Sequence, residues 1–170
     1  MTAMRGRDAP VPRGWRLLLS AVAAVEFLGG LRDLSMLFAN LSEVPGPGLG
    51  GAIIMAKIVL QPILGLIALF CAASGRIGAA LLAMAAIILM TWLTWLPSVA
   101  RHGLDFKGPV FVSLQLIFQI VIAPLLAATL ATLAVRSSRT ALAIGLAVLP
   151  TLVSLLGVVA FGIGVARYGF

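Results

Sequence analysis

Charged side chains are scarce in this sequence. Only 10% of the 170 residues are Asp, Glu, Lys or Arg, while 62% are hydrophobic. Ordinary soluble domains are about a quarter charged and about half apolar, so this composition excludes a soluble domain of the usual kind. The sequence has a series of long apolar runs instead, and such runs are typical of membrane-spanning helices.

Residues that carry catalysis or bind metals are equally scarce. The chain has one histidine, His102, and one cysteine, Cys71, so it can form neither a multi-histidine metal or haem site nor an intrachain disulfide. The segment 46–51 matches the glycine pattern of dinucleotide-binding loops, but it contains proline and follows an apolar helix instead of a strand. We therefore expect no enzymatic activity, no cofactor and no metal. The alternative is an intramembrane enzyme that uses Glu26 or Asp33.

Acidic residues are outnumbered by basic ones, five against twelve, which gives a formal net charge of +7. A basic surface that binds nucleic acid would gather its Arg and Lys residues in a patch or stripe. Here the arginines stand between the apolar runs, without aromatic residues interleaved. We therefore expect no nucleic-acid partner, and we interpret the positive charge as fixing the orientation of the chain in a membrane.

The apolar runs predict an all-α fold, a polytopic membrane helix bundle. A helix needs about 20 residues to cross the hydrocarbon core of a bilayer. Five segments reach that length: 16–39, 51–73, 77–97, 109–135 and 140–166. Residues 1–15 are expected to form a basic cytoplasmic arm, and residues 16–170 a single transmembrane domain.

The last four segments also suggest an internal duplication. The second and fourth segments each contain a proline and end in a basic turn, and the third and fifth close on Val-Ala-Arg. This pattern is consistent with a repeated helical hairpin, formed by spans two and three and again by spans four and five. Parallel repeats of this kind occur in transporters.

Seven polar or charged residues inside these segments are candidates for function, because a polar group in hydrocarbon is costly without a partner or a role. Glu26 is predicted near the midplane of the membrane and the others at comparable depths in its outer half, so we expect them to form one network. They are Glu26, Arg32 and Asp33 on the first segment, Lys57 and Gln61 on the second, and Gln115 and Gln119 on the fourth.

Glu26 falls near the middle of its segment, and Asp33 and Asn40 follow on the same helical face at intervals of seven residues. Gly29 and Gly30 lie on or beside this face and allow close helix packing. Glu26 and Asp33 balance the charges of Arg32 and Lys57, so we expect Lys57 to reach Asp33 directly or Glu26 through a water.

Two functions agree with these residues. The first is a non-enzymatic accessory or assembly subunit of a membrane complex, in which the polar network joins helices of this chain to each other or to other subunits or copies. The second is a small transporter or channel for protons or a small polar solute, with Glu26 at the floor of an outward-facing polar cavity. A carboxylate near the midplane of the bilayer suits the handling of protons or cations.

The opening RLLLSAVAAVEFLGGLRDL, together with the later GRIGAALLAM, resembles the small DoxX-type membrane bundles. The likeness covers about a third of the chain and uses common apolar residues. The fifth predicted span of this chain departs from the pattern of those bundles. We infer no function from the resemblance.

The basic residues near the span ends predict the orientation, because cytoplasmic loops carry an excess of Lys and Arg. Seven fall on one side of the membrane: Arg5, Arg7, Arg13, Arg16, Arg76, Arg136 and Arg139. Four fall on the other: Lys57, Arg101, Lys107 and Arg167. Richness in Ala, Gly, Leu and Arg is typical of GC-rich bacterial genomes. We therefore expect a bacterial inner-membrane protein with a cytoplasmic N-terminus and a periplasmic C-terminus.

A reporter that is active only in the cytoplasm tests this orientation. Fused after Phe170, it should remain inactive, because five spans place the two termini on opposite sides. The same reporter fused at the Ser74–Arg76 turn should be active. Activity of the fusion at Phe170 would mean that the number of spans is even.

Overall fold

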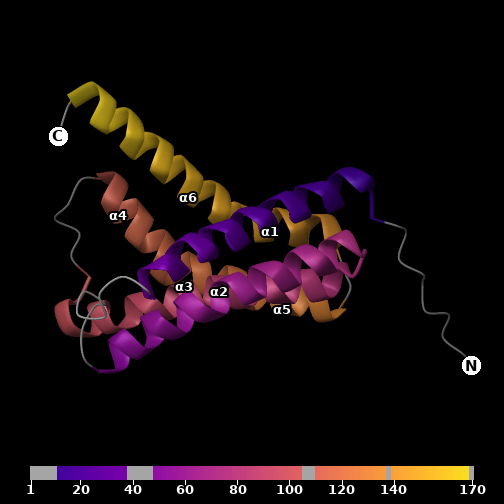
Figure 1. Cartoon of the computed structure of the whole chain (residues 1–170), viewed down its shortest axis with the longest axis horizontal. Helices are drawn as coiled ribbons and strands as arrows, with labels where there is room; N and C mark the ends of the chain where they lie inside the picture. The colour runs from indigo at the N-terminus through magenta and orange to yellow at the C-terminus, as the bar shows by residue number, and fades with distance from the viewer. Residues whose placement is uncertain (1–10, 38–47, 105–109, 137–138, 169–170) are drawn as a thin grey trace, which may run out of the picture.

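A computed structural model describes residues 11–37, 48–104, 110–136 and 139–168, and these residues fold into a bundle of helices (Figure 1). The helices are α1 (Arg13–Leu34), α2 (Leu49–Ala73), α3 (Ile77–His102), α4 (Val110–Ile117), α5 (Ala123–Arg136) and α6 (Thr140–Tyr168). A short 3-10 turn, η1 (Ser35–Leu37), ends the first helix, and a π-helical segment, η3 (Phe118–Ile122), joins α4 to α5.

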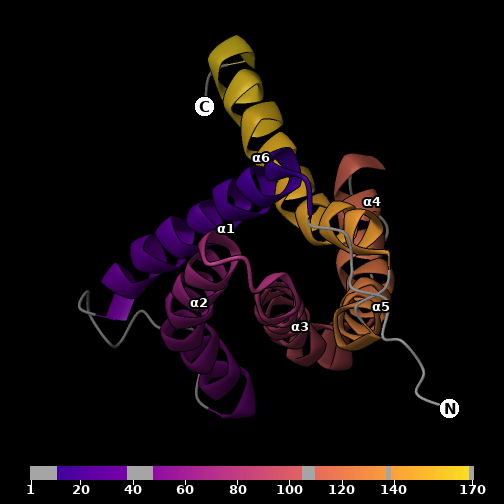
Figure 2. The ribbon, with the colours of Figure 1, turned by 90° about the vertical axis from the view of Figure 1, so that its right-hand side faces the viewer.

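The all-α membrane bundle expected from the sequence is confirmed. Four helical stretches are long and apolar enough to cross a membrane: Leu49–Ala73, Ile77–Arg101, Ser113–Arg136 and Thr140–Arg167. The first predicted span forms α1, whose 22 residues include five charged ones, and it is not among the four. α1 packs along α2, which in turn packs against α3, so it belongs to the bundle (Figures 1 and 2).

The tight turn between α2 and α3 follows from its glycine. Gly75 has a φ of +80°, a conformation that costs glycine little. It lets the Arg76 N–H reach the Cys71 carbonyl at 2.8 Å and its own N–H reach the Ala72 carbonyl at 3.2 Å, which is a Schellman cap. The guanidinium of Arg16, on α1, donates to the Ala73 carbonyl at 2.9 Å and so stabilises the same helix end.

The crossing of α1 and α2 is exceptionally close because two glycines lie in it. A Cβ atom on Gly30 would lie 2.7 Å from the backbone nitrogen of Pro62, and one on Gly65 would lie 2.8 Å from the Cα of Phe27. Both neighbours are backbone atoms, which cannot rotate away. Small residues allow helices in membranes to approach in this way. Gly29, the other glycine expected at the contact, meets nothing within 4 Å.

The buried core occupies only one half of the bundle. It comprises the N-terminal halves of α1, α3 and α6, the C-terminal half of α2, and α5. These are the helix ends that carry Arg13, Arg16, Arg76, Arg136 and Arg139, and we call this the arginine end. At the opposite end, the open end, the C-terminal part of α6 diverges from the other helices (Figures 1 and 2). No side chain described beyond Thr151 is buried.

Three details differ from the simple picture of five spans. α3 runs to His102, through Pro97, whereas the sequence suggested an end at residue 97. The fourth span is interrupted by η3. The two hairpins proposed as repeats also differ, since α2 and α3 pack together closely while α6 diverges from α5 (Figure 1); the duplication stays a prediction. Asn40, Lys107 and residues 1–10 of the arm lie outside the described residues.

The close crossing predicts that Gly30→Ala destabilises the protein. The added methyl group forces α1 and α2 apart, at a cost of about 1–3 kcal/mol in the free energy of unfolding. Gly29→Ala is the matched control, since the same change one residue earlier meets no neighbour. Thermal unfolding in detergent should show a lower midpoint for Gly30→Ala alone. Equal midpoints for the two variants would contradict the close contact.

Candidate functional site

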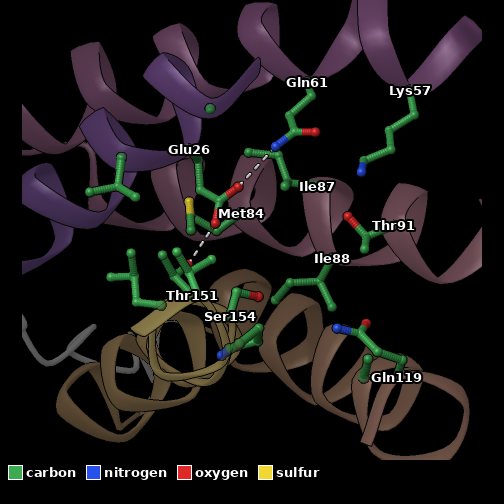
Figure 3. Close-up of a pocket in the computed structure, with 16 residues that line it drawn as sticks. Glu26, Lys57, Gln61, Met84, Ile87, Ile88, Thr91, Gln119, Thr151 and Ser154 are labelled. Carbon is green, nitrogen blue, oxygen red and sulfur yellow. Dashed lines mark hydrogen bonds between the residues drawn. The ribbon is translucent and has the colours of Figure 1, made fainter. Parts of the chain in front are cut away.

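A cavity of about 240 Å³ lies next to the α1–α2 crossing, between the core and the open end (Figure 3). Residues of α1, α2, α3, η3, α5 and α6 line it, and its rim includes the exposed side chains of Val25, Leu155 and Val158, so it is a partly open hollow within the bundle. Its apolar wall includes Met84, Ile87 and Ile88 of α3. Seven polar side chains interrupt that wall: Glu26, Lys57, Gln61, Thr91, Gln119, Thr151 and Ser154.

Glu26 is held at one side of the cavity by two donors from different helices. The Gln61 side-chain amide donates to Oε2 at 3.1 Å, and the Thr151 hydroxyl donates to Oε1 at 2.7 Å (Figure 3). Thr151 is 4% exposed, so this bond is well shielded. The carboxylate therefore connects α1, α2 and α6 at one point. Each of its oxygens keeps a lone pair for a further donor.

Other polar groups of the cavity have no partner among the described residues: the hydroxyls of Thr91 and Ser154, and three groups that matter more for binding. Oε1 of Gln61 is buried and accepts no hydrogen bond. Gln119 is only 9% exposed and faces the cavity, yet its amide bonds to no described residue (Figure 3). Lys57 points into the same space and forms no ion pair within the described part of the chain. Buried polar atoms are normally paired, so Gln61 Oε1 calls for a donor from outside the described residues, while the half-buried Lys57 and the Gln119 amide remain available for further hydrogen bonds.

The position of Gln119 depends on a break in the helix around it. Pro124 has no N–H and leaves the carbonyl of Ile120, four residues earlier, without its usual donor. The backbone forms the π-helical turn η3 at this point, in which the Ala123 N–H donates a hydrogen bond to the Phe118 carbonyl. The indole N–H of Trp92 donates to the Ile120 carbonyl at 3.1 Å. Such π segments occur frequently at functional sites, and this one contains Gln119.

A second hollow continues from the cavity towards the open end. Its volume is about 400 Å³, and Asp33, Thr94, Trp95 and Ser98 are among its lining residues. Lys57 lines both spaces, so its side chain stands at the boundary between them. Asp33 and Lys57 therefore share this hollow, although no ion pair joins them in the described structure. The two hollows therefore lie on either side of Lys57, one beside Glu26 and the other at the open end.

The structure brings four of the seven candidate residues to the cavity: Glu26, Lys57, Gln61 and Gln119. Asp33 lies in the adjoining hollow. Arg32 and Gln115 have exposed side chains and line neither space. Gln115 precedes Gln119 by one turn, on the side of the open end, where neighbouring helices diverge. Lys57 forms no ion pair with Asp33 or Glu26 within the described residues, and its contact with Glu26 through a water stays a prediction.

Two cavity residues were not foreseen from the sequence, Thr151 and Ser154 of α6. They follow Pro150 within the last apolar run and are spaced three residues apart, so a signal was present in the pattern of polar residues. As for metals, the described residues contain no group of three His, Cys, Asp or Glu side chains that would hold an ion. The chemistry of the cavity is therefore that of hydrogen bonds and of two opposite charges.

Comparisons with known proteins add no assignment to this geometry. No protein-family model matches the chain, and searches of curated proteins and of solved structures find no match either. The resemblance to DoxX-type bundles consequently has no support beyond the residues that suggested it.

The bond between Trp92 and the π segment predicts that Trp92→Phe destabilises the bundle. The substitution keeps the ring but leaves the Ile120 carbonyl unpaired, at a cost of about 1–3 kcal/mol. Trp95→Phe is the control, because the indole of Trp95 makes no hydrogen bond with described residues. Unfolding midpoints of the purified variants measure the difference. A Trp95→Phe variant as unstable as Trp92→Phe would show that the bond contributes little.

Proposed function

We propose that this integral membrane protein is a small, non-enzymatic transporter that binds a small polar solute in the cavity around Glu26. The observation that carries the proposal is the set of unpartnered polar groups, Gln61 Oε1, Gln119 and Lys57, gathered in one cavity. A solute with hydrogen-bonding groups offsets the cost of burying them.

The accessory-subunit hypothesis requires a different arrangement. A polar network that only joins helices should satisfy its own members, because a partly satisfied network is worse than an apolar contact. Glu26 fits that description, since both of its oxygens accept hydrogen bonds from neighbouring helices. Lys57 and Gln119, which face Glu26 across the cavity, are not satisfied by other described residues in this way. Binding of a solute accounts for both sets of residues.

The uneven packing of the bundle supports access from one side. The buried core closes the arginine end, and the two hollows lead to the open end. Cytoplasmic loops are rich in arginine, so the arginine end is assigned to the cytoplasm and the open end to the outside. This arrangement corresponds to the outward-open state of a carrier. Pro150, which lines the cavity where α6 leaves the core, is suited to serve as the hinge of α6.

Uptake into vesicles tests the proposal with probes that differ in charge. Purified protein is reconstituted and offered four labelled compounds: methylammonium, valine, acetate and glycerol. We expect uptake of at least one probe above that of empty vesicles. Glu26→Gln, which keeps the shape of the side chain, should reduce this uptake about tenfold or more, since a hydrogen bond to a charged group contributes about 1.5–3 kcal/mol.

The matched control is Thr129→Val on α5. The Thr129 side chain is exposed and bonds only to the Leu125 carbonyl of its own helix, so uptake should be unchanged. If no probe enters, or if Glu26→Gln and the unchanged protein carry the probes equally well, the transporter hypothesis fails and the accessory subunit remains. Co-purification of other membrane proteins would then be the next measurement.

A further inference from the structure

We infer that the solute is a small zwitterion with a primary ammonium group and an anionic group, such as an α-amino acid with a small apolar side chain. This inference rests on the proposed function and adds the substrate class. It follows from the separation of the two charged groups, since Glu26 and Lys57 lie on different sides of the cavity (Figure 3).

The ammonium group belongs at the Glu26 side. Glu26 supplies a negative charge with lone pairs to spare, and the buried Oε1 of Gln61 needs a hydrogen-bond donor. The other atom of the same amide, Nε2, donates to Glu26, while Oε1 points away from the carboxylate into the space in front of Lys57 (Figure 3). A primary ammonium carries three N–H groups and can donate to both at once. A quaternary ammonium has no N–H and leaves Oε1 unpaired.

The anionic group belongs at the opposite side. Figure 3 shows the Lys57 ammonium, the Thr91 hydroxyl and the Gln119 amide on the side of the cavity away from Glu26 and Thr151. Lys57 has no carboxylate partner among the described residues, and an unpaired ammonium at this depth is costly. A carboxylate of the solute can accept from Lys57 and from the Gln119 amide. The carboxylate of a zwitterion thus supplies the anionic partner that Lys57 does not have among the described residues.

The charge balance and the size of the cavity agree with this solute. Glu26 and Lys57 make the cavity neutral in sum, so a neutral solute with two separated charges leaves no uncompensated charge. The volume of about 240 Å³ is sufficient for a solute of the size of a small amino acid. Between the two ends, the apolar wall of Met84, Ile87 and Ile88 fits a hydrocarbon side chain.

Simple ions satisfy only half of the site. An alkylammonium ion pairs with Glu26 but leaves the positive charge of Lys57 uncompensated. An alkyl carboxylate pairs with Lys57 but leaves Oε1 of Gln61 without a donor. Each therefore forgoes one charged interaction, which corresponds to a loss of about tenfold to a hundredfold in affinity.

Binding to the purified protein in lipid nanodiscs tests this inference. Valine is compared with isobutylamine, which lacks its carboxylate, and with isovalerate, which lacks its amine. Valine should bind at least about tenfold more tightly than either fragment. Glycine, alanine and leucine cover smaller and larger side chains. Glycine betaine, without N–H groups, should bind more weakly than glycine.

Two variants separate the ends of the site and control for folding. Lys57→Gln should lose the preference for valine over isobutylamine while it still binds isobutylamine, which shows that the cavity persists. Glu26→Gln should lose the preference for valine over isovalerate and keep isovalerate binding. Thr129→Val should retain both preferences.

The outcomes distinguish this inference from the proposed function. If methylammonium or acetate is transported, and none of the amino acids binds better than its fragments, the zwitterion is excluded and the transporter stands. The zwitterion is likewise excluded if Lys57→Gln leaves the preference for valine unchanged. If no probe binds or enters vesicles, both proposals fail.

Discussion

The close approach of α1 and α2 is the constraint on which the cavity depends. Because Gly30 meets Pro62 and Gly65 meets Phe27 without intervening side chains, the two helix backbones are nearly in contact. At this separation Gln61 reaches Glu26 with a hydrogen bond of 3.1 Å. The carboxylate is thereby fixed in orientation, and Thr151 of α6 completes its coordination. The position of the Glu26 carboxylate thus depends on the close packing of the α1 and α2 backbones as well as on its hydrogen bonds to Gln61 and Thr151.

On the opposite side of the cavity, a proline changes the hydrogen bonding of the helix that carries Gln119. Pro124 deprives one carbonyl of its donor, and the π-helical turn with the Trp92 indole compensates for the loss. The irregular turn directs the amide of Gln119 towards the cavity and away from lipid. Irregular backbone inside a membrane is tolerated where neighbouring helices or a cavity satisfy its polar groups. On both sides of the site, a local departure from regular helix geometry positions a polar side chain. The close glycine crossing positions Glu26, and the π-helical turn positions Gln119.

Hydropathy was sufficient to predict the helix bundle, because the length of an apolar run and the breaks between runs determine where a membrane helix begins and ends. Depth along the membrane also indicated that Lys57, Gln61 and Gln119 lie at similar levels, with Glu26 nearer the midplane. Depth fixes only one coordinate, however. It does not say which helix faces which, so Thr151 and Ser154 of α6 were missed, and Gln115 was included although it is exposed. The π-helical turn depends on a donor from α3, a contact between segments that no local pattern contains.

The length of α6 has a consequence for the lipid around the protein. Its 29 residues extend over about 44 Å at 1.5 Å per residue, whereas the hydrocarbon core of a bilayer is about 30 Å thick. A helix with such a hydrophobic mismatch tilts until its apolar surface is covered. Figure 2 shows the C-terminal part of α6 inclined away from the bundle, and the length of the helix allows this inclination within a bilayer. Since residues of α6 also line the cavity, we expect bilayer thickness, through the tilt of this helix, to affect the width of its mouth.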